Sequence, residues 1–506
     1  MSARTLVVGG GLAGLLAARR HLRQGHRVVL LEATGSVGGA IAQTMLPGTG
    51  EPPRTGEVSS AGELQRTGEL SRGGGLTVNA GAEAYSTGAG AVDALVTELG
   101  LAERIVAPRE GLGSRVVSSA GVHRAPGGSL LGIPGRPFAA DARAVLGTAG
   151  ALRASLERFL PAAVGARPGA TVAEVVGTRL GRKVLERLVA PVVGGVHSAD
   201  PATLEFAAAS PALSHGLAEH GSLTAAVRRI RGRSSGPRNA GSAANAGTRV
   251  HALSPTMALL PQTLQAQFLA AGGILRTGVE VVDLARDETG WIVRTSRQEE
   301  LRADQLVLAC PPDTARELLR DAAPGIAEAI PQAPSAAVRL VALVLDAPAL
   351  DAFPSGTGAL VAPGTVGIRA KALTHGSAKW EHVQQALHDA LPTAGSPHLL
   401  RLSYGRPGEQ MPARGEIVGL ALADASRILG VPLSGTQLLA SEVIDWDRAM
   451  RQPQPGHRAA LDTLTGLLAE QPSLELVGSW RAGTGIDAIV RADDAHSHPR
   501  SEGTPS

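Results

Sequence analysis

The sequence contains few cysteine and aromatic residues. Of 506 residues one is cysteine, and aromatic residues make up 2%. A single thiol, Cys310, excludes an internal disulfide framework and CxxC redox chemistry. Because Cys310 follows the apolar run QLVLA, we expect it to be packed at the end of a buried strand. The cores must then be built from aliphatic side chains and alanine, within a hydrophobic fraction of 43%.

Lysine is also scarce, so arginine carries almost all of the positive charge. Only Lys183, Lys371 and Lys379 are lysines among 48 basic residues. A chain that uses arginine so widely makes each remaining lysine a candidate for a position that arginine does not fit. The formal net charge of +3 is too small a bias to argue for nucleic-acid binding.

Long apolar runs are missing too. No stretch reaches the roughly 18 residues of a membrane-spanning helix, so we expect none. The N-terminal MSAR precedes an apolar run, but no small-residue cleavage site lies before Arg19 and Arg20, which argues against a secretory signal. We expect a cytoplasmic protein and leave peripheral membrane contact open. No Cys/His cluster with metal-ligand spacing, Ser/His/Asp set or paired acid motif stands out, so we assign no metal and no catalytic side chain.

The strongest positive signal lies near the N-terminus, in TLVVGGGLAGLLAARRHLRQGHRVVLLEATGSVGGAI. Its apolar pattern predicts a strand over residues 5–8, a helix over 12–24 and a second strand over 27–31. Gly9, Gly11 and Gly14 fall between the first strand and the helix at the spacing G-x-G-x-x-G, and Glu32 follows the second strand. This context predicts a dinucleotide-binding unit.

Each of these positions has a physical role in holding a dinucleotide. The first glycine allows a tight turn, the second lets the backbone approach a pyrophosphate, and the third lets the helix pack closely on the strand. The N–H groups at the helix N-terminus attract the phosphates, and Glu32 would accept the ribose hydroxyls. The Gly38–Gly39 pair resembles the extended fingerprint of two-domain flavin oxidases, which favours FAD over NAD.

Elements typical of a nucleotide-binding domain recur at the beginning, middle and end of the chain. We therefore expect an α/β fold with a Rossmann-type FAD-binding domain, interrupted by a substrate-binding α+β domain and a helical domain, as in flavin amine oxidases. Two low-complexity stretches predict flexible insertions. The expected units are an FAD-binding domain in three parts (1–85 with an insertion at 47–75, 251–325 and 441–495), a helical or substrate domain (86–225), a flexible insertion (226–250), a substrate-binding domain (326–440) and a disordered tail (496–506).

An ordered set of motifs resembles one family. VNAGAEAYSTGAGAVDALVTELGLAERIV, RAPGGSLLGIP, APVVGGVHSADPATLEFAAASPAL, LLRLSYGRPGE, DWDRAMRQPQPGH and VGSWRAGTGIDAI follow one another along the chain. In this order they are similar to the porphyrinogen oxidases of heme synthesis, most of all to the soluble bacterial type that acts on coproporphyrinogen III. The resemblance covers nearly the whole chain except the two insertions and the tail.

The resemblance also implies which residues hold FAD. Ala82 and Ala84 depart from the family's usual Gly-Pro-Asp/Glu-Ser, so a serine hydroxyl contact would be lost, and Ala40 stands where related enzymes are often basic. The implied cofactor-binding residues are Gly9, Gly10, Gly11, Leu12, Ala13, Gly14, Glu32, Ala33, Gly38, Gly39, Gly81, Ala82, Glu83, Ala84, Val281, Trp446, Gly483, Gly485 and Ile486.

Rare residue types gather in the C-terminal half and suggest a substrate pocket. Lys371, Lys379 and Tyr404 are the candidates to wall a pocket for a flat, carboxylate-bearing macrocycle, with lysines near propionates and aromatic rings beside it. Trp380 belongs to the same group. Ordinary packing is an equally weighted interpretation for each residue taken alone. His457 is expected to be structural rather than a catalytic base, and His197 is a weaker candidate still.

The activity that the resemblance implies is oxidation of coproporphyrinogen III to coproporphyrin III. A hydride would pass from a bridge carbon to flavin N5 while a pyrrole N–H releases a proton, so the cofactor performs the difficult chemistry. Dioxygen would reoxidise the flavin and yield hydrogen peroxide, and a ferrochelatase is an expected recipient of the product. The alternatives are protoporphyrinogen IX oxidation, a flavin amine oxidase, a carotenoid desaturase and a non-catalytic porphyrin-binding protein.

Overall fold

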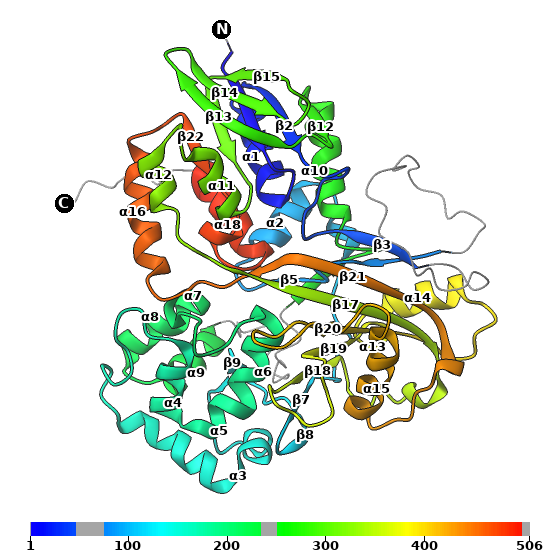
Figure 1. The fold of residues 1–506 in the computed structure, drawn as a ribbon. Helices are drawn as coiled ribbons and strands as arrows, with labels where there is room; N and C mark the ends of the chain where they lie inside the picture. The colour runs from blue at the N-terminus through cyan, green and yellow to red at the C-terminus, as the bar shows by residue number, and fades with distance from the viewer. Residues whose placement is uncertain (1, 47–74, 234–249, 498–506) are drawn as a thin grey trace.

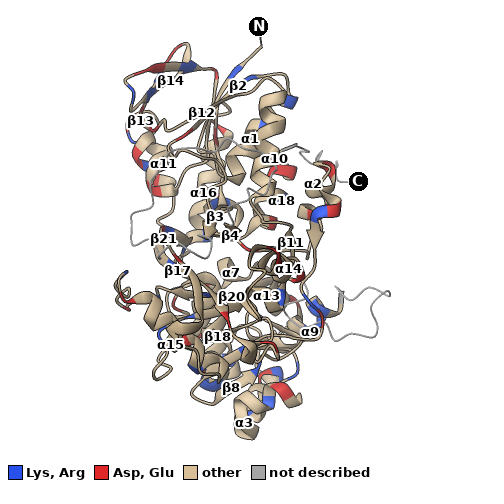
Figure 2. Ribbon diagram, turned by 90° about the vertical axis from the view of Figure 1, so that its right-hand side faces the viewer, with Lys and Arg blue, Asp and Glu red and all other residues tan. Residues whose placement is uncertain are grey.

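A computed structural model describes residues 2–46, 75–233 and 250–497 (Figure 1). The upper half of the molecule holds the first and the last described elements of the chain, β1 and α18, and the lower half consists of a helical region beside a large sheet. Acidic and basic residues lie mostly on the outer helices and turns, while the strands between them are largely uncharged (Figure 2). The two halves meet along two long strands that cross the middle of the molecule.

A five-stranded parallel sheet forms the centre of the upper half. Its strands are short runs of buried Val and Leu, the pattern of a parallel sheet that is covered on both faces. The strand order is β12 (Ile274–Thr277), β2 (Arg27–Glu32), β1 (Arg4–Val8), β16 (Gln305–Leu308) and β22 (Leu474–Leu476).

Helices cover one face of this sheet, and a smaller sheet with further helices covers the other. On the first face α1 (Leu12–Arg23) packs with α10 (Leu259–Ala270), α2 (Ala91–Glu98) and α18 (Ile486–Ser497). The second face carries the antiparallel strands β13 (Val281–Asp287), β14 (Gly290–Thr295) and β15 (Glu300–Ala303), with α11 (Pro312–Leu319), α12 (Pro324–Ala329) and α16 (His457–Ala469).

A seven-stranded mixed sheet dominates the lower half. Helix α15 (Ile417–Leu429) covers one face, while α13 (Gly376–Lys379) and α14 (Glu381–Ala390) lie on the other, toward the upper half. The strand order is β21 (Leu438–Arg451), β17 (Ser335–Asp346), β20 (Pro397–Tyr404), β19 (Ala372–His375), β18 (Gly358–Val361), β7 (Arg115–Ser118) and β8 (Gly121–Arg124).

The helical region beside this sheet is fixed by a fully buried ion pair. Arg179 Nε donates to Glu157 Oε1 over 2.9 Å, and both side chains are completely buried. Glu157 also accepts hydrogen bonds from Ser222 and from the backbone N–H groups of Leu223 and Thr224, which begin α9. The helices are α3 (Ala140–Ser155), α4 (Val172–Leu180), α5 (Arg182–Val184), α6 (Ala190–Val192), α7 (Phe206–Ala209), α8 (Pro211–His220) and α9 (Leu223–Arg233).

Short strands connect these larger units. β3 (Gln43–Leu46) and β4 (Leu76–Asn79) form an antiparallel pair in which Leu46 lies opposite Leu76. The remaining strands are β5 (Tyr85–Ser86), β11 (Val250–Leu253) and β6 (Ile105–Val106), which form one small sheet, and β9 (Ser129–Leu130) with β10 (Ile133–Pro134).

The structure corrects several predicted boundaries. The limit at 440/441 falls inside β21, which pairs with β17 as far as Arg451. Helix α9 occupies the start of the predicted insertion 226–250, because Ala226 and Val227 are buried. Strands β7 and β8, from the predicted helical or substrate domain 86–225, are part of the seven-stranded sheet whose other strands come from residues 335–451. Most of the two insertions and of the tail lies outside the described residues, and the other domain limits stay predictions.

Candidate cofactor and substrate site

The glycine turn after β1 has a mixture of crowded and open positions. Gly9 has a φ of +106°, and a Cβ there would lie 2.8 Å from the carbonyl oxygen of Ala309. A Cβ on Gly14 would lie 1.9 Å from the oxygen of Gly9. Gly11 differs, because its φ is −69° and a Cβ would meet no protein atom within 4 Å. The turn therefore packs tightly on the sheet and leaves space beside Gly11.

This space lies at the N-terminus of α1. Gly11 is the N-cap residue, and no side chain caps the helix. Leu12 begins the helix and is buried, while Ala13 is half-buried. The free N–H groups of the first turn and the positive end of the helix dipole suit a phosphate group. The turn thus fits the pyrophosphate of a dinucleotide.

Glu32 is held beside the same turn. Its Oε2 accepts the Gly10 N–H over 2.6 Å, and its Oε1 accepts the N–H and hydroxyl of Thr34 over 2.8 and 2.7 Å. The next residue, Ala33, is exposed, and the backbone oxygen of Glu32 accepts the N–H of Val279, two residues before Val281. Glu32, Ala33 and Val281 therefore lie at one end of the site, as an adenosine requires.

The second glycine pair touches the first turn. Gly38 donates to the oxygen of Gly10 over 2.9 Å, and a Cβ on Gly39 would lie 3.4 Å from Gly11 Cα. Gly38 has a φ of +115° and would clash with the oxygen of Ile41 if it carried a side chain. The sequence-predicted extension of the fingerprint is thus in contact with the fingerprint itself.

Two further predicted segments complete this side of the site. Gly81 would place a Cβ 2.2 Å from the oxygen of Ala40 and 3.2 Å from the ring of Trp446. Trp446 on β21 donates from Nε1 to the oxygen of Ala80 over 2.9 Å, and Ala82 donates to the oxygen of Ala40. At the C-terminal end, Gly483 and Gly485 have φ values of +105° and +112° and lead into α18 at the buried Ile486.

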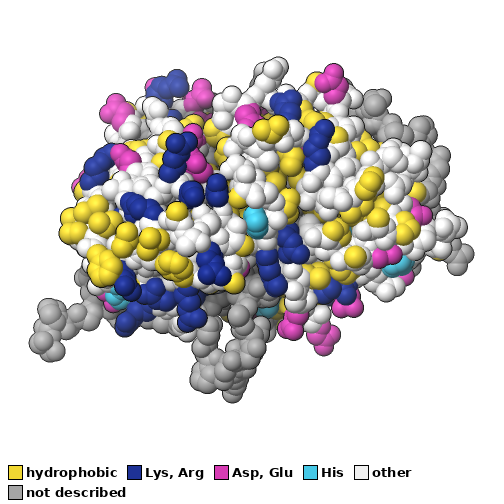
Figure 3. All heavy atoms as spheres, turned by 90° about the horizontal axis from the view of Figure 1, so that it is seen from below, with side chains coloured by type: hydrophobic (Ala, Val, Ile, Leu, Met, Phe, Trp, Pro, Cys, Tyr) yellow, Lys and Arg dark blue, Asp and Glu magenta, His cyan; other side chains and the backbone are white. Residues whose placement is uncertain are grey.

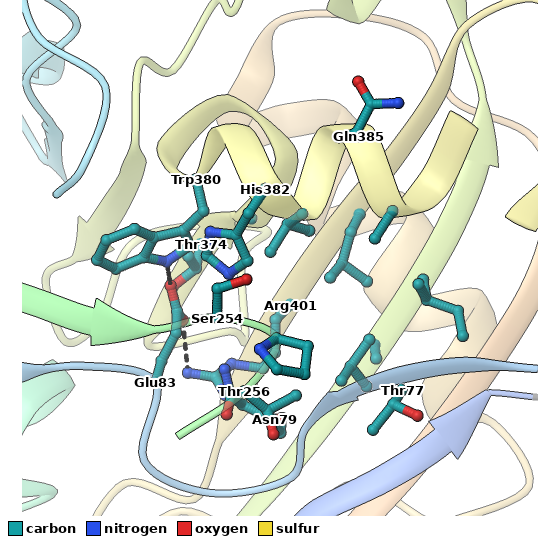
Figure 4. Close-up of a pocket in the computed structure, with 18 of the residues that line it drawn as sticks. Thr77, Asn79, Glu83, Ser254, Thr256, Thr374, Trp380, His382, Gln385 and Arg401 are labelled. Atoms are coloured by element: carbon teal, nitrogen blue, oxygen red, sulfur yellow. Dashed lines mark hydrogen bonds and ion pairs between the residues drawn. The ribbon is translucent and has the colours of Figure 1, made fainter. Parts of the chain in front are cut away.

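Glu83 lies in a cluster of charges at the border of a cavity. Its carboxylate accepts hydrogen bonds from Arg401 over 2.8 Å and from Trp380 Nε1 over 2.5 Å (Figure 4). The carboxylate also pairs with Lys379 over 3.2 Å. Burial alone would raise the pKa of Glu83, but the charges of Lys379 and Arg401 lower it to about 2. The neighbouring Ala84 is half-buried and packs against the core beneath α2.

A cavity of about 280 Å³ adjoins this cluster. Trp380 and His382 border it from the start of α14, Arg401 from β20, and Thr77 and Asn79 from β4, with Ser254 and Thr256 on a further loop (Figure 4). His382 Nδ1 is buried without a hydrogen-bond partner among the described residues. The volume of the cavity is close to the lower end of the range of about 300–1,000 Å³ that is usual for ligand sites.

The predicted substrate residues do not form one wall. The ammonium group of Lys379 forms an ion pair with the carboxylate of Glu83. Lys371 is buried where the helical region meets the sheet, and its Nζ donates to Ser198 Oγ over 2.7 Å and to the oxygen of Gly405 over 2.9 Å. Burial, aided by Arg406, lowers the pKa of Lys371 to about 7.

Tyr404 corrects the prediction for the substrate pocket. Its side chain packs in the core beneath α15, and its hydroxyl donates to Asp424 over 3.2 Å. Tyr404 lies three residues after Arg401 on β20, and alternate residues of a strand face opposite sides. The tyrosine therefore points away from the cavity that Arg401 borders.

The remaining candidates have structural surroundings. His457 is buried, and its Nε2 lies 3.1 Å from the oxygen of Trp480, as expected for a structural histidine. Burial lowers the pKa of both His457 and His197. Cys310 is buried in the core below the sheet, which raises the pKa of its thiol to about 12. Within the described ranges no group of side chains could hold a metal ion, and no helix is long and apolar enough to cross a membrane.

Arg401 is the residue that sequence reasoning missed. It donates to Glu83 and to the carbonyl oxygens of Asn79 and Gly81. Arg401 thus joins β20 of the seven-stranded sheet to residues 79–83. A signal was present, because Arg401 is the one strongly basic side chain in the apolar strand PHLLRLSY. A charge in such a buried strand indicates a specific partner.

Comparison with known proteins agrees with this geometry. Residues 12–485 match the family model described as flavin containing amine oxidoreductase. The chain belongs to this family. The solved structure of a cyclohexylamine oxidase shares the fold, so the predicted flavin amine oxidase-like architecture is confirmed. Membership also implies a flavin cofactor, which the glycine turn and Glu32 fit.

The relatives confirm the resemblance to porphyrinogen oxidases. The chain is 30% identical over 495 residues to the coproporphyrinogen III oxidase of Mycobacterium leprae, covering 96% of this chain and 95% of that protein. A crystal structure of a "Putative protoporphyrinogen oxidase" from Exiguobacterium sp. 255-15 is 20% identical, with a TM-score of 0.74 over 99% of this chain and 98% of that one. Cyclohexylamine oxidase from Brevibacterium oxydans is 17% identical, with a TM-score of 0.63 over 99% and 98%.

Proposed function

We propose that this protein binds FAD and oxidises coproporphyrinogen III to coproporphyrin III. The observation that carries the proposal is that the open space at Gly11 and the seven-stranded sheet lie beside the same segments of chain. Gly38 and Gly39 contact the turn at Gly11, and Trp446 of the seven-stranded sheet contacts Ala80 and Gly81, which lie against Ala40. These contacts lie in a chain similar over nearly its full length to proteins named coproporphyrinogen III oxidase. A dinucleotide site adjoining a substrate sheet is the arrangement that a flavin oxidase needs.

The residues of the chain would bind and orient the reactants. The first turn of α1 would hold the diphosphate, and Glu32 would accept the ribose hydroxyls. Trp446 and the N-terminus of α18 at Ile486 would border the ring system, where a helix dipole favours negative charge. Bound FAD would supply the two-electron oxidising chemistry.

The overall reaction follows from the proposed substrate and product. Conversion of the porphyrinogen to the aromatic porphyrin removes six electrons and six protons, in three steps that each remove two electrons and two protons. Three molecules of dioxygen would accept them and leave as three molecules of hydrogen peroxide. A cytoplasmic location and transfer of the product to a ferrochelatase belong to the same proposal.

The decisive experiment compares two porphyrinogens. We expect porphyrin fluorescence to grow faster with coproporphyrinogen III than with protoporphyrinogen IX, with one peroxide formed per two electrons removed, and to stop after the bound flavin is reduced when dioxygen is excluded. A preference for protoporphyrinogen IX under air would overturn the substrate assignment. No turnover of either, with flavin bound, would favour the porphyrin-binding alternative.

A finer test concerns the four propionates of coproporphyrinogen III. Lys371 is the stronger lysine candidate because Glu83 neutralises Lys379. If Lys371 contacts a propionate, Lys371→Ala should raise KM for coproporphyrinogen III more than KM for protoporphyrinogen IX, which has two propionates. A loss of one charged hydrogen bond corresponds to about tenfold or more in KM. The exposed Lys183 provides the control, and equal effects on both substrates would make Lys371 structural.

A further inference from the structure

Glu205 has a buried carboxylate oxygen that no described residue satisfies. On the face seen from below, acidic side chains lie mostly toward the rim of the molecule (Figure 3). Glu205 instead lies inside the helical region, directly before α7, with 4% of its surface exposed. Its Oε2 atom is buried and has no hydrogen-bond partner among the described residues. Such an oxygen is costly to bury, so a donor is expected beside it.

His457 lies across a junction from Glu205. The Glu205 N–H donates to the oxygen of Pro453 over 3.1 Å, so α7 lies beside the chain that enters α16 (Figure 1). His457 is the first residue of α16 and is 7% exposed, and its Nδ1 is a second buried atom with no partner in the described ranges. Burial lowers the pKa of His457, and the nearby charge of Glu205 opposes that shift.

The other ring nitrogen of His457 decides what Nδ1 can do. His457 Nε2 lies 3.1 Å from the backbone oxygen of Trp480, which can only accept, so Nε2 must carry a proton. Because burial lowers the pKa, the imidazole is neutral near pH 7, and Nδ1 is then a bare acceptor. The Glu205 carboxylate is also only an acceptor. Two acceptors cannot bond to each other, so a group that donates two hydrogen bonds must lie between them.

We propose that one buried water molecule bridges Glu205 Oε2 and His457 Nδ1, and that this bridge holds the chain beside the flavin site in position. A water donates two hydrogen bonds and is the usual partner of isolated buried polar atoms. Because α16 has no side-chain cap, the free N–H groups of its first turn offer the water oxygen a further donor. The inference rests on the proposed FAD site and deepens it.

The bridge acts on the proposed flavin site through Trp480. This residue belongs to α17 (Ser479–Ala482), and Gly483 and Gly485 follow it and lead into α18. Glu205 and His457 are therefore positioning residues, which connect the helical region to the N-terminus of α18. Since this helix end favours negative charge, a loosened connection should weaken the stabilisation of a reduced, anionic flavin.

A crystal structure of the intact flavoprotein tests the bridge directly. We expect one ordered water within about 2.5–3.2 Å of both Glu205 Oε2 and His457 Nδ1. A direct bond between the two side chains, or a separate water on each atom, would overturn the proposal.

Variants test the bridge through the cofactor. Glu205→Leu and His457→Gln each leave the opposite acceptor buried, and each should raise the dissociation constant of FAD about tenfold and lower the flavin midpoint potential. His457→Gln keeps a donor for Trp480, because the glutamine amide nitrogen falls near the Nε2 position. Since both side chains bind one water, the double variant should also lose about tenfold rather than a hundredfold. Glu205→Gln should retain nearly the original affinity, because its amide can donate to the water.

Controls use exposed residues of the same types. His388→Gln on α14 and Glu470→Leu after α16 should change neither flavin affinity nor potential. Effects that multiply in the double variant would overturn the shared water. A lower unfolding temperature with unchanged flavin affinity and potential would overturn the positioning role and leave ordinary packing. These measurements use no porphyrinogen, so failure of the proposed oxidation would not be mistaken for failure of the bridge.

Discussion

Gly11 and Gly14 have opposite surroundings although they lie three residues apart. A side chain on Gly11 would enter open space, whereas one on Gly14 would strike the oxygen of Gly9. We expect Gly11→Val to fold normally, because its φ of −69° suits any residue, and to lose flavin because valine would fill the pyrophosphate position. The measurement is the ratio of flavin to protein absorbance, which we expect to fall by about tenfold or more.

Gly14→Val is the matched comparison. It should lower the thermal unfolding temperature and the soluble yield, because the helix could no longer pack on β1. If Gly11→Val instead retained its full flavin content, the space beside Gly11 would not be a phosphate site. A loss of folding in both variants would show that the turn tolerates no side chain at either position.

Glu83 gives a prediction about pH. Its side chain is 13% exposed, and Glu83→Gln would leave Arg401 and Lys379 together without a counter-charge. We expect a loss of about 3 kcal/mol in the free energy of unfolding at pH 7. Because the folded pKa of about 2 lies below the usual value near 4.3, the stabilisation is complete above the unfolded pKa. It is lost as the pH falls through the folded pKa.

Urea unfolding of the original chain and of Glu83→Gln at several pH values tests this expectation. The difference between the two proteins should be largest at neutral pH and should shrink between about pH 4 and pH 2. Glu317→Gln is a suitable control, because that glutamate is exposed and lies 3.8 Å from Arg320 at the surface. A difference that stays constant across the range would assign the effect of Glu83 to packing rather than charge.

Residues close together in sequence could be predicted, and distant partners could not. The spacing of Gly9, Gly11 and Gly14 identified the turn, because its chemistry is local. Nothing local connects Glu83 with Lys379 and Arg401, about 300 residues later. These three side chains come together only because the seven-stranded sheet and α13 pack against the residues that follow β4.

At the scale of elements, the β3–β4 pair makes a prediction about chain length. Leu46 and Leu76 already lie opposite each other, so their ends are close without any help from the residues between them. Replacing 47–74 by a short turn should change the free energy of unfolding by only about 1 kcal/mol, since loop-closure entropy depends weakly on length. Denaturant unfolding and flavin content provide the measurement, and loss of either would show that the segment packs on the body.

The positions of strands with a clear apolar pattern could be predicted from the sequence. The side of a strand that faces a ligand, and the length of a strand, could not. The pattern of VVLL and its neighbours placed β1, α1 and β2 to within a residue or two. Tyr404 was assigned to the pocket because a period of two does not say which side of a strand faces a ligand. Strand β21 crosses a predicted domain boundary, because its pairing with the distant β17 decides its length.

At the scale of the whole molecule, several polar contacts join the halves beside the candidate site. For example, Trp446 from β21 donates to the backbone oxygen of Ala80, and Arg401 from β20 donates to the backbone oxygen of Gly81. The alternation of domain types along the chain predicted that such halves exist, because local patterns identify each kind of element. Their relative placement could not be read from the sequence, since it rests on a few long-range polar contacts and on the packing of α14.

The central parallel sheet has a consequence for biosynthesis. Its strand β1 is synthesised about 300 residues before its partner β16, and the edge strand β22 follows about 170 residues after β16. Long-range pairings of this kind form slowly and only when both partners exist. Until β16 has been synthesised, the sheet of the nascent N-terminal part is incomplete and one edge of β1 has no strand partner. An unpaired strand edge can bind chaperones or aggregate. A chain that stalls before β16 and β22 are made would lack the finished sheet on which the glycine turn packs, and we expect such a chain to carry no flavin.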